Sequence, residues 1–372
     1  MINFSNKSKY FRATDGVMVY LLGLVGIFAV SSMVSGALLY VLDSIVTSYP
    51  TVGEVINMGL NALIQVALVG VYYFYISKLD ARPQICIKKT HPVAIILGAV
   101  TAVIALLGFI VPATLFDNLL IKIGYVMTAF EVQTVAGKVA LVFVTVICAP
   151  IGEELIFRSA LLSGLKRKFS APICILINGI AFSLMHMNPA QTVYQFALGC
   201  ALASVALASG SVIPAMVGHM TSNLIACLIE FFPEGLNKIF LPIINFGMKN
   251  AVCVIILVVL AVALHVVIYF VIKRFGKDEE NIQVVEPEFF DSDMQPVFAT
   301  DPYYAQKHEA HLSSGEGDGR DGRGLQGLLR KRYDAKHSEC GGIFGKNTFA
   351  VGLAVGLAFC AVMWLLSLLV MI

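Results

Sequence analysis

Three pairs of residues, each four positions apart, stand out in a sequence that is otherwise strongly apolar. They are Glu154 with Arg158, Phe182 with His186, and His219 with Asn223. Glu153 directly precedes the first pair. Residues four apart share one face of a helix. If these helices meet, they bring an unpaired carboxylate, two imidazoles and a carboxamide together, and such a set can activate water for hydrolysis.

The two adjacent glutamates have different neighbours along their helix. Glu154 has Arg158 one turn away, which predicts an ion pair. Glu153 has Phe157 at the same offset and no local cation. A carboxylate left without a cation in apolar surroundings suits a general base. Glu153 is therefore the predicted base, and Glu154 is accounted for by its ion pair with Arg158.

Each pair alone also has a purely structural interpretation. A single histidine in a membrane helix often serves only as a hydrogen-bonding contact between helices. We assign that structural role to His265, which stands in the apolar run "AVALHVVIYF". The ion pair of Glu154 and Arg158 could likewise act only in packing. The occurrence of three such pairs in consecutive order favours one shared site.

The elements that carry these residues are predicted to be membrane helices. The chain is 58% hydrophobic and 13% charged, against about 25% charged in soluble domains. A net charge of +2 and the lack of a Gly-rich phosphate loop give no indication of nucleic-acid binding. The eight cysteines are scattered without a CxxC pair, which argues against a disulfide framework or a zinc ribbon.

Apolar windows of about 20 residues predict nine membrane-spanning helices. These cover 17–41, 55–76, 92–115, 138–162, 171–188, 193–209, 212–232, 251–273 and 349–371. The predicted fold is all-α, a polytopic bundle of about eight core helices in residues 1–276 and one further helix in 348–372. The three pairs fall on the fourth, fifth and seventh spans.

Residues 277–347 have a different composition from the rest of the chain. The stretch "SSGEGDGRDGRG" is rich in Gly and mixed charge, which is typical of an unfolded linker, so we expect a disordered cytoplasmic loop. Lys and Arg concentrate in alternate loops, which predicts a cytoplasmic N-terminus and an outer C-terminus. Lys122, Lys238 and Lys249 fit this orientation least well.

The three motifs Glu153-Glu154-x-x-x-Arg158, Phe182-x-x-x-His186 and His219-x-x-x-Asn223 resemble those of the CPBP family, also called the CAAX protease or Abi family. Its members are intramembrane endopeptidases, and the resemblance covers about residues 138–232. It implies that Glu153 is catalytic and that His186 orients or deprotonates the attacking water. It further implies that His219 and Asn223 donate hydrogen bonds to the oxyanion.

The resemblance leaves the metal requirement open, because the family has been described both as metalloproteases and as metal-free glutamate enzymes. Glu153, His186 and His219 could form a His₂Glu zinc site with water as the fourth ligand. Asn223 is an unusual addition to such a set, so we expect no obligatory metal. Neither an HExxH helix nor a GxSxG elbow is present in the sequence.

Two other functions remain as alternatives to an endopeptidase. A proton-coupled transporter could use the same residues as a relay, although the sequence has no clear inverted repeat. A membrane scaffold or a bacteriocin-immunity protein could bind a partner without cleaving it. The expected partners are a peptide or protein substrate, membrane-anchored or not, and the lipid bilayer. The compact loops favour a bacterial cell membrane, and there a signal-like peptide or a peptide pheromone is the favoured substrate.

Overall fold

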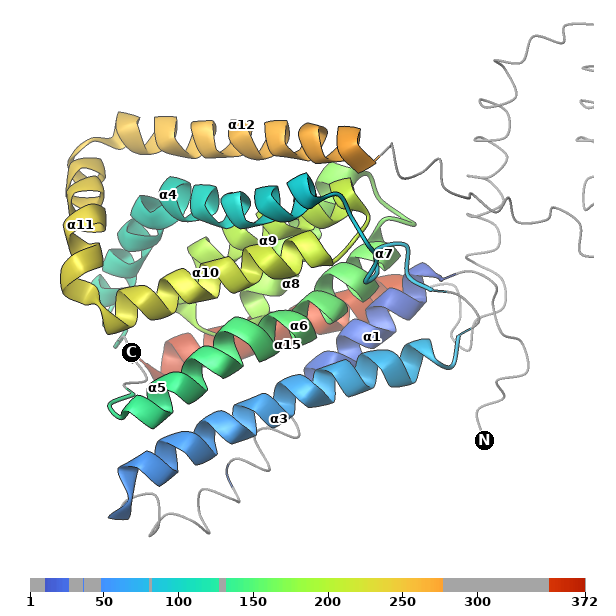
Figure 1. The fold of residues 1–372 in the computed structure, drawn as a ribbon, viewed down its shortest axis with the longest axis horizontal. Coiled ribbons are helices and arrows are strands. Elements are labelled where there is room, and N and C mark those ends of the chain that lie inside the picture. Colours follow the sequence, from blue (N-terminus) through green and yellow to red (C-terminus); the bar gives the residue numbers. More distant parts are fainter. Residues whose placement is uncertain are drawn as a thin grey trace, which may run out of the picture. The chain divides into compact units, whose positions relative to one another are not determined.

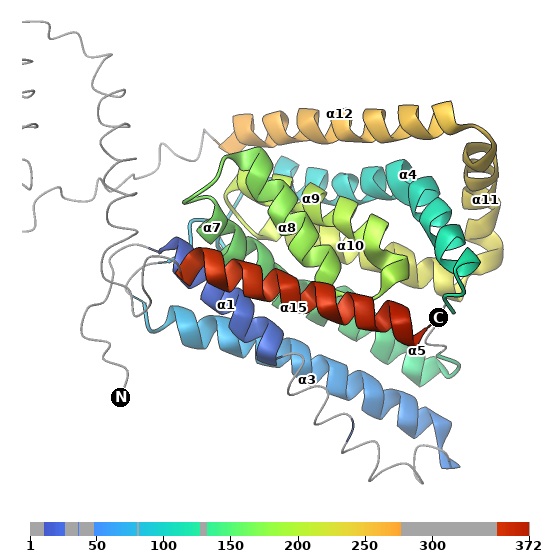
Figure 2. The ribbon, with the colours of Figure 1, turned by 180° about the vertical axis from the view of Figure 1, so that it is seen from behind.

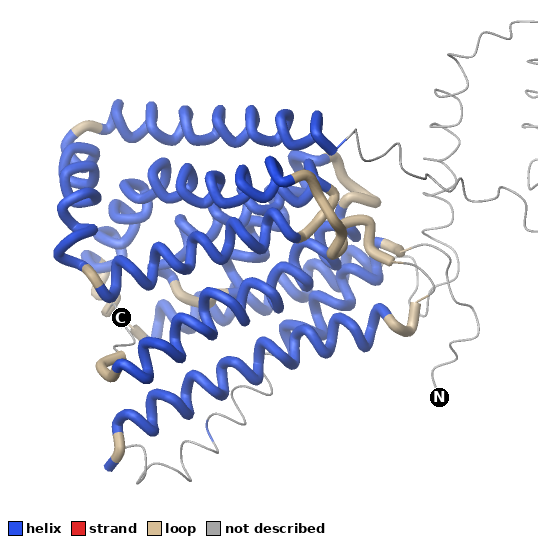
Figure 3. Tube along the Cα trace, viewed as in Figure 1, coloured by secondary structure: helices blue, strands red, loops and turns tan. Residues whose placement is uncertain are grey.

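The computed structural model describes residues 11–26, 36, 48–79, 82–126, 132–276 and 348–371. These residues form helices and connecting turns, with one isolated β-bridge between Cys86 and Ser211 (Figure 3). The prediction of an all-α fold is confirmed. The expected linker at 277–347 and most of the first predicted span beyond Gly26 lie outside the described residues.

The helices follow one another along the chain as shown in Figure 1. They are α1 (Ala13–Val25), α3 (Pro50–Ile76), α4 (Pro92–Lys122), α5 (Val135–Val142), η2 (Phe143–Cys148), α6 (Ala149–Glu154), η3 (Leu155–Leu161), α7 (Leu162–Leu165), α8 (Ala171–Met185), η4 (Pro189–Gln191), α9 (Thr192–Ser209), α10 (Ile213–Phe231), α11 (Pro233–Lys249), α12 (Ala251–Gly276) and α15 (Thr348–Val370). The segments η2 and η3 are π-helical, and η4 is a 3₁₀ turn.

Six of the described helical stretches are long and apolar enough to cross a membrane. They are Thr51–Ile76, Pro92–Lys122, Val135–Leu165, Pro189–Ser209, Ala251–Phe275 and Thr348–Val370. The helices α1 and α8 are apolar but shorter. The predicted seventh span coincides with α10, which is not among the six, since the polar run His219–Asn223 lies within it. The chain is a polytopic helical membrane protein.

The sequence windows leave residues 233–250 as a connection, whereas the structure folds most of them into α11. This helix runs across the ends of its neighbours and joins α10 to α12 (Figure 1). Its apolar residues alternate with polar ones such as Asn237, Lys238 and Asn245. A window that averages hydropathy therefore misses it, and only helical periodicity would indicate it.

Close approaches at glycine bring the site-bearing helices together. A Cβ on Gly98 of α4 would overlap the carbonyl oxygen of Pro214 in α10. A Cβ on Gly199 of α9 would lie 3.0 Å from Cα of Gly179 in α8. Small residues at such crossings let membrane helices pack backbone against backbone. The helices α8 and α10, packed in this way on α9 and α4, also contact the α5–α7 segment, which brings their polar side chains near the two glutamates.

The C-terminal helix α15 packs beside α1 and also contacts α8 and η4 (Figure 2). Cys360 of α15 is fully buried, and its sulfur lies 3.7 Å from the hydroxyl of Tyr20 in α1. The last helix thus joins the membrane core formed by residues before 276.

Candidate active site

The two glutamates lie in the middle of one continuous helical segment, Val135–Leu165, at the end of α6. The π-helical segments η2 and η3 flank α6 on both sides. Such π-helical turns occur frequently at functional sites. Glu154 is fully buried and Glu153 is 8% exposed, so both carboxylates lie inside the protein.

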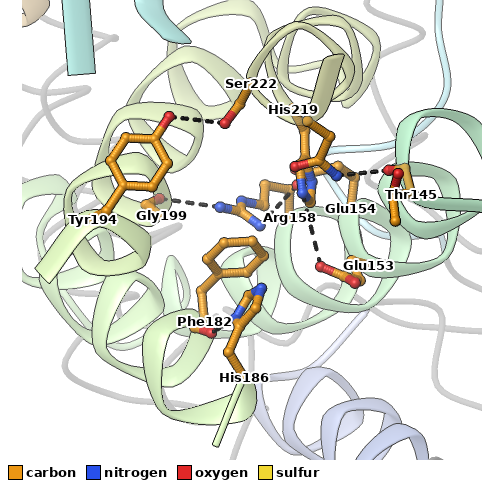
Figure 4. A network of polar contacts seen from close by, with 11 residues as sticks. Thr145, Glu153, Glu154, Arg158, Phe182, His186, Tyr194, Gly199, His219 and Ser222 are labelled. Atoms are coloured by element: carbon orange, nitrogen blue, oxygen red, sulfur yellow. Dashed lines mark hydrogen bonds and ion pairs between the residues drawn. The ribbon is translucent and has the colours of Figure 1, made fainter. Parts of the chain in front are cut away.

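Glu154 accepts hydrogen bonds from two cationic or potentially cationic side chains (Figure 4). Nη1 of Arg158 and Nδ1 of His219 each lie 2.9 Å from its Oε1. Nη2 of Arg158 donates to the carbonyl of Gly199 at 3.2 Å. The geometry of the predicted ion pair is present, and it also reaches α9 and α10. Because all three side chains are almost completely buried, charge balance within this group is essential.

Glu153 lies beside this group without a hydrogen bond to it. Its Oε2 is buried and has no hydrogen-bond partner among the described residues. Nε2 of His219 lies 4.0 Å from this oxygen. Since Nδ1 of His219 must donate to the Glu154 carboxylate, the other ring nitrogen is the one that faces Glu153. The structure therefore pairs an unpartnered carboxylate oxygen with an available imidazole nitrogen.

Phe182 connects the two histidines to the ion pair (Figure 4). Its ring centroid lies 4.3 Å from Cζ of Arg158, which is a cation–π contact. The same ring meets His186 edge-to-face at 4.9 Å and His219 at 5.5 Å. Nδ1 of His186 donates to the carbonyl of Phe182 at 2.8 Å, so Nε2 of His186 is the nitrogen free to accept a proton.

Asn223, which the resemblance makes a donor to the oxyanion, also has a partner within the protein. Its Nδ2 donates to the carbonyl of Thr145 in η2 at 2.7 Å, which ties α10 to the glutamate-bearing segment. One amide hydrogen of Nδ2 remains for another acceptor. Ser222 next to it contacts the hydroxyl of Tyr194 at 2.9 Å. Asn223 thus contributes both a helix contact and a spare donor.

The sequence reasoning did not identify several polar contacts that hold the glutamate helix. The hydroxyl of Tyr72 donates to Oγ of Ser159, which in turn donates to the carbonyl of Ile85, each at 2.6 Å. Nδ2 of Asn178 donates to the carbonyl of Phe157 at 2.8 Å. Asn178 is a polar residue inside the apolar span 171–188, so the sequence does indicate that its side chain needs a partner. The contact of Tyr72 with Ser159 joins residues far apart in sequence, and no local pattern indicates it.

His265 has partners of its own, separate from those of the other two histidines. Its Nδ1 lies 2.7 Å from the carbonyl of Ala261, and its Nε2 lies 3.2 Å from the carbonyl of Thr101. This contact joins α12 to α4 and agrees with the structural role expected for it.

The residues that could form a zinc site do not make up a ligand set in this arrangement. Within the described part of the chain, no three His, Cys, Asp or Glu side chains are gathered closely enough to hold a metal ion. Glu153, His186 and His219 are the right ligand types for zinc, but the structure does not bring them within metal-coordination distance as a group. We therefore derive no catalytic step through a metal.

Residues 135–225 match the family described as type II CAAX prenyl endopeptidase, Rce1-like. The match begins at the start of α5 and ends within α10, so it contains every residue of the three motifs. No curated protein and no solved structure matches the chain. The family resemblance expected from the three motifs is confirmed for residues 135–225.

Proposed function

We propose that this chain, a member of the CAAX protease family by its residues 135–225, is an intramembrane endopeptidase in which Glu153 activates water. One observation carries the proposal. Oε2 of Glu153 is buried, has no hydrogen-bond partner among the described residues, and lies 4.0 Å from Nε2 of His219. This separation is too long for a direct hydrogen bond. A water molecule about 2.8 Å from both atoms, to one side of the line between them, would bridge them.

In the proposed reaction, Glu153 takes one proton from this water while its oxygen attacks the carbonyl carbon of the peptide bond. The carbonyl oxygen becomes an oxyanion. As the C–N bond breaks, the proton held by Glu153 passes to the leaving nitrogen, which restores the carboxylate. Atoms and charge balance with one water consumed for each bond cleaved.

The remaining motif residues are assigned supporting roles in this reaction. Nε2 of His186 accepts the second hydrogen of the water and orients it, because Nδ1 is occupied by the Phe182 carbonyl. The spare amide hydrogen of Asn223 donates to the oxyanion. His219 donates to it as well when both of its ring nitrogens carry protons, and the adjacent carboxylates of Glu153 and Glu154 offset that charge.

The ion pair of Glu154 and Arg158 keeps the environment of Glu153 fixed. Arg158 neutralises Glu154, and Glu154 holds the ring of His219 so that Nε2 faces Glu153. We further propose that cleavage takes place near the cytoplasmic side of a bacterial cell membrane. We also propose that the chain is oriented with its N-terminus in the cytoplasm and its C-terminus outside.

The test is turnover by the full chain in lipid nanodiscs, with quenched peptides in prenylated and unprenylated forms. Wild type should release the fluorophore, and Glu153→Ala should not. Binding of the peptides without turnover by wild type would favour a scaffold. A proton flux in proteoliposomes that depends on these residues, without cleavage, would favour a transporter.

A chelator added to the same assay tests the metal requirement. Turnover that persists in excess EDTA supports the metal-free reaction. Loss of turnover that is restored by adding zinc would overturn this part of the proposal.

A further inference from the structure

We propose that α15 is a positioning element of the active site, in which Trp364 holds the turn that carries His186. This inference rests on the proposed function, because it takes His186 to orient the attacking water. Trp364, the only tryptophan of the chain, donates from Nε1 to Oγ1 of Thr192 at 2.8 Å. These two residues lie far apart in sequence, and α15 lies outside the family match at 135–225.

The turn between α8 and η4 has a backbone conformation that its neighbours must maintain. His186 ends α8, and the next residue, Met187, has φ of 50°. Residues other than glycine rarely adopt this left-handed region, and they do so where surrounding contacts hold them. The strained residue is therefore adjacent to the imidazole whose direction matters for catalysis.

Thr192 is the point at which the contacts within this turn converge. Its Oγ1 donates to the carbonyl of Pro189 at 2.7 Å, and its own carbonyl accepts from Oγ of Ser183 at 2.8 Å. Ser183 lies on α8 one turn before His186, so Thr192 connects both sides of the turn. Oγ1 of Thr192 donates to Pro189 and accepts from Trp364, so both hydrogen-bonding functions of this hydroxyl are used.

A second contact from the end of α15 reaches the same turn through the residues after α4. The carbonyl of Met371 accepts from the backbone N–H of Val126 at 2.8 Å. The adjacent Tyr125 donates from its hydroxyl to Oδ1 of Asn188 at 3.4 Å. Oδ1 of Asn188 also accepts from the N–H of Ala190 at 3.0 Å. The end of α15 therefore supports the turn directly at Thr192 and indirectly at Asn188.

The packing of α15 on α1 fixes the position from which Trp364 reaches Thr192. A Cβ on Gly356 would lie 2.7 Å from Cε1 of Tyr20, and one on Gly352 would lie 2.8 Å from Cγ1 of Val17. Glycines four residues apart allow this close helix contact. Trp364 follows Gly356 by about two helical turns, and its polar edge reaches Thr192 at the start of α9. In a membrane, the indole N–H needs such a partner.

The test compares full-length variants by hydrogen–deuterium exchange in nanodiscs. Trp364→Phe removes the indole donor, and Thr192→Val removes the hydroxyl with little change of shape. The backbone N–H groups of His186, Met187 and Gln191 are hydrogen-bonded within the turn, so they report on its opening. We expect their exchange to rise about two- to tenfold in both variants, which is the range for loss of one hydrogen bond.

Matched variants separate positioning from general destabilisation. Thr192→Ser keeps the hydroxyl and should retain the exchange of wild type. Thr114→Val removes a hydroxyl that donates within its own helix, to the carbonyl of Ile110, and should leave the turn unchanged. Trp364 fluorescence should shift in Thr192→Val and not in Thr192→Ser, since it is the sole indole. Exchange of α8 and α9 away from the turn should stay unchanged in all four variants.

Turnover gives the second readout. Trp364→Phe and Thr192→Val should lower kcat with little change in KM, and Thr192→Ser should restore kcat. Unchanged hydrogen exchange at residues 186–191 in both Trp364→Phe and Thr192→Val would overturn the proposal. So would a kcat of Thr192→Ser that is as low as that of Thr192→Val. If wild type shows no turnover, the proposed function fails, and the exchange and fluorescence data still decide whether α15 holds the turn.

Discussion

Nε2 of His219 faces Oε2 of Glu153 at 4.0 Å, while Nδ1 of the same ring is 2.9 Å from Oε1 of Glu154. One imidazole thus lies between two carboxylates of consecutive residues and contacts them through different nitrogens. The carboxylate of Glu154, which is fully buried and pairs with Arg158, fixes the imidazole ring of His219. The Nε2 edge of that ring then faces the carboxylate of Glu153. The two glutamates therefore have unequal parts: Glu154 positions the ring, and Glu153 is left without a hydrogen-bond partner among the described residues.

Arg158→Ala should reduce the amount of folded protein. It leaves the Glu154 carboxylate buried without its cation, and breaking a buried ion pair in this way costs about 3–5 kcal/mol. Thermal unfolding in detergent measures the loss. The double variant Glu154→Gln with Arg158→Met should recover much of the stability, because it removes both charges. Wild-type stability of Arg158→Ala would contradict the ion-pair assignment.

His219→Ala should abolish turnover with little loss of folded protein, since Glu154 keeps its bond to Arg158. The loss should be at least about 100-fold in kcat, as for removal of a positioned acid, base or oxyanion donor. His265→Ala is the matched control, because that ring contacts only backbone carbonyls of α12 and α4 in its described hydrogen bonds. Equal activity of both variants would remove His219 from the mechanism.

Asn223→Ala should lower kcat by about 100- to 1,000-fold if its spare amide hydrogen reaches the oxyanion. It should also lower stability by about 1 kcal/mol, the net contribution of one hydrogen bond, since the donor to the Thr145 carbonyl is lost. Steady-state kinetics and thermal unfolding separate the two effects. A change in stability alone would assign Asn223 to helix packing.

Gly98→Ala should destabilise the protein by about 1–3 kcal/mol, because its Cβ would overlap the carbonyl of Pro214 and force α10 away from α4. Gly70→Ala provides the control, since a Cβ there meets nothing within 4 Å. Thermal unfolding of the two variants gives the comparison. Equal stability of Gly98→Ala and Gly70→Ala would show that α4 and α10 can move apart at little cost in free energy.

Contacts within one helical turn could be predicted from the sequence, and contacts between distant segments could not. The spacing of Glu154 and Arg158 was enough to predict their pairing, because four residues fix one helical face. The bond from Asn223 to Thr145 depends on how α10 crosses η2, which local periodicity does not contain. The contact of Trp364 with Thr192 joins residues that only the packing of α15 brings together.

The helices, too, could be located from the sequence only in part. Mean hydropathy located α3, α4, α9, α12 and α15, whose apolar runs are long. It missed α11, because polar residues at helical spacing lower the mean hydropathy of this amphipathic helix. It also gave no sign of the π-helical segments η2 and η3, because mean hydropathy does not distinguish a π-helical turn from an α-helical one.

The most direct measurement is the kcat of Glu153→Gln, in full-length protein in nanodiscs, beside the matched variant Glu230→Gln at an exposed glutamate of α10. The amide keeps the shape of the side chain but cannot take a proton from water. We predict that Glu153→Gln loses at least about 100-fold in kcat, while Glu230→Gln retains wild-type turnover. Wild-type turnover by Glu153→Gln would show that another group activates the water.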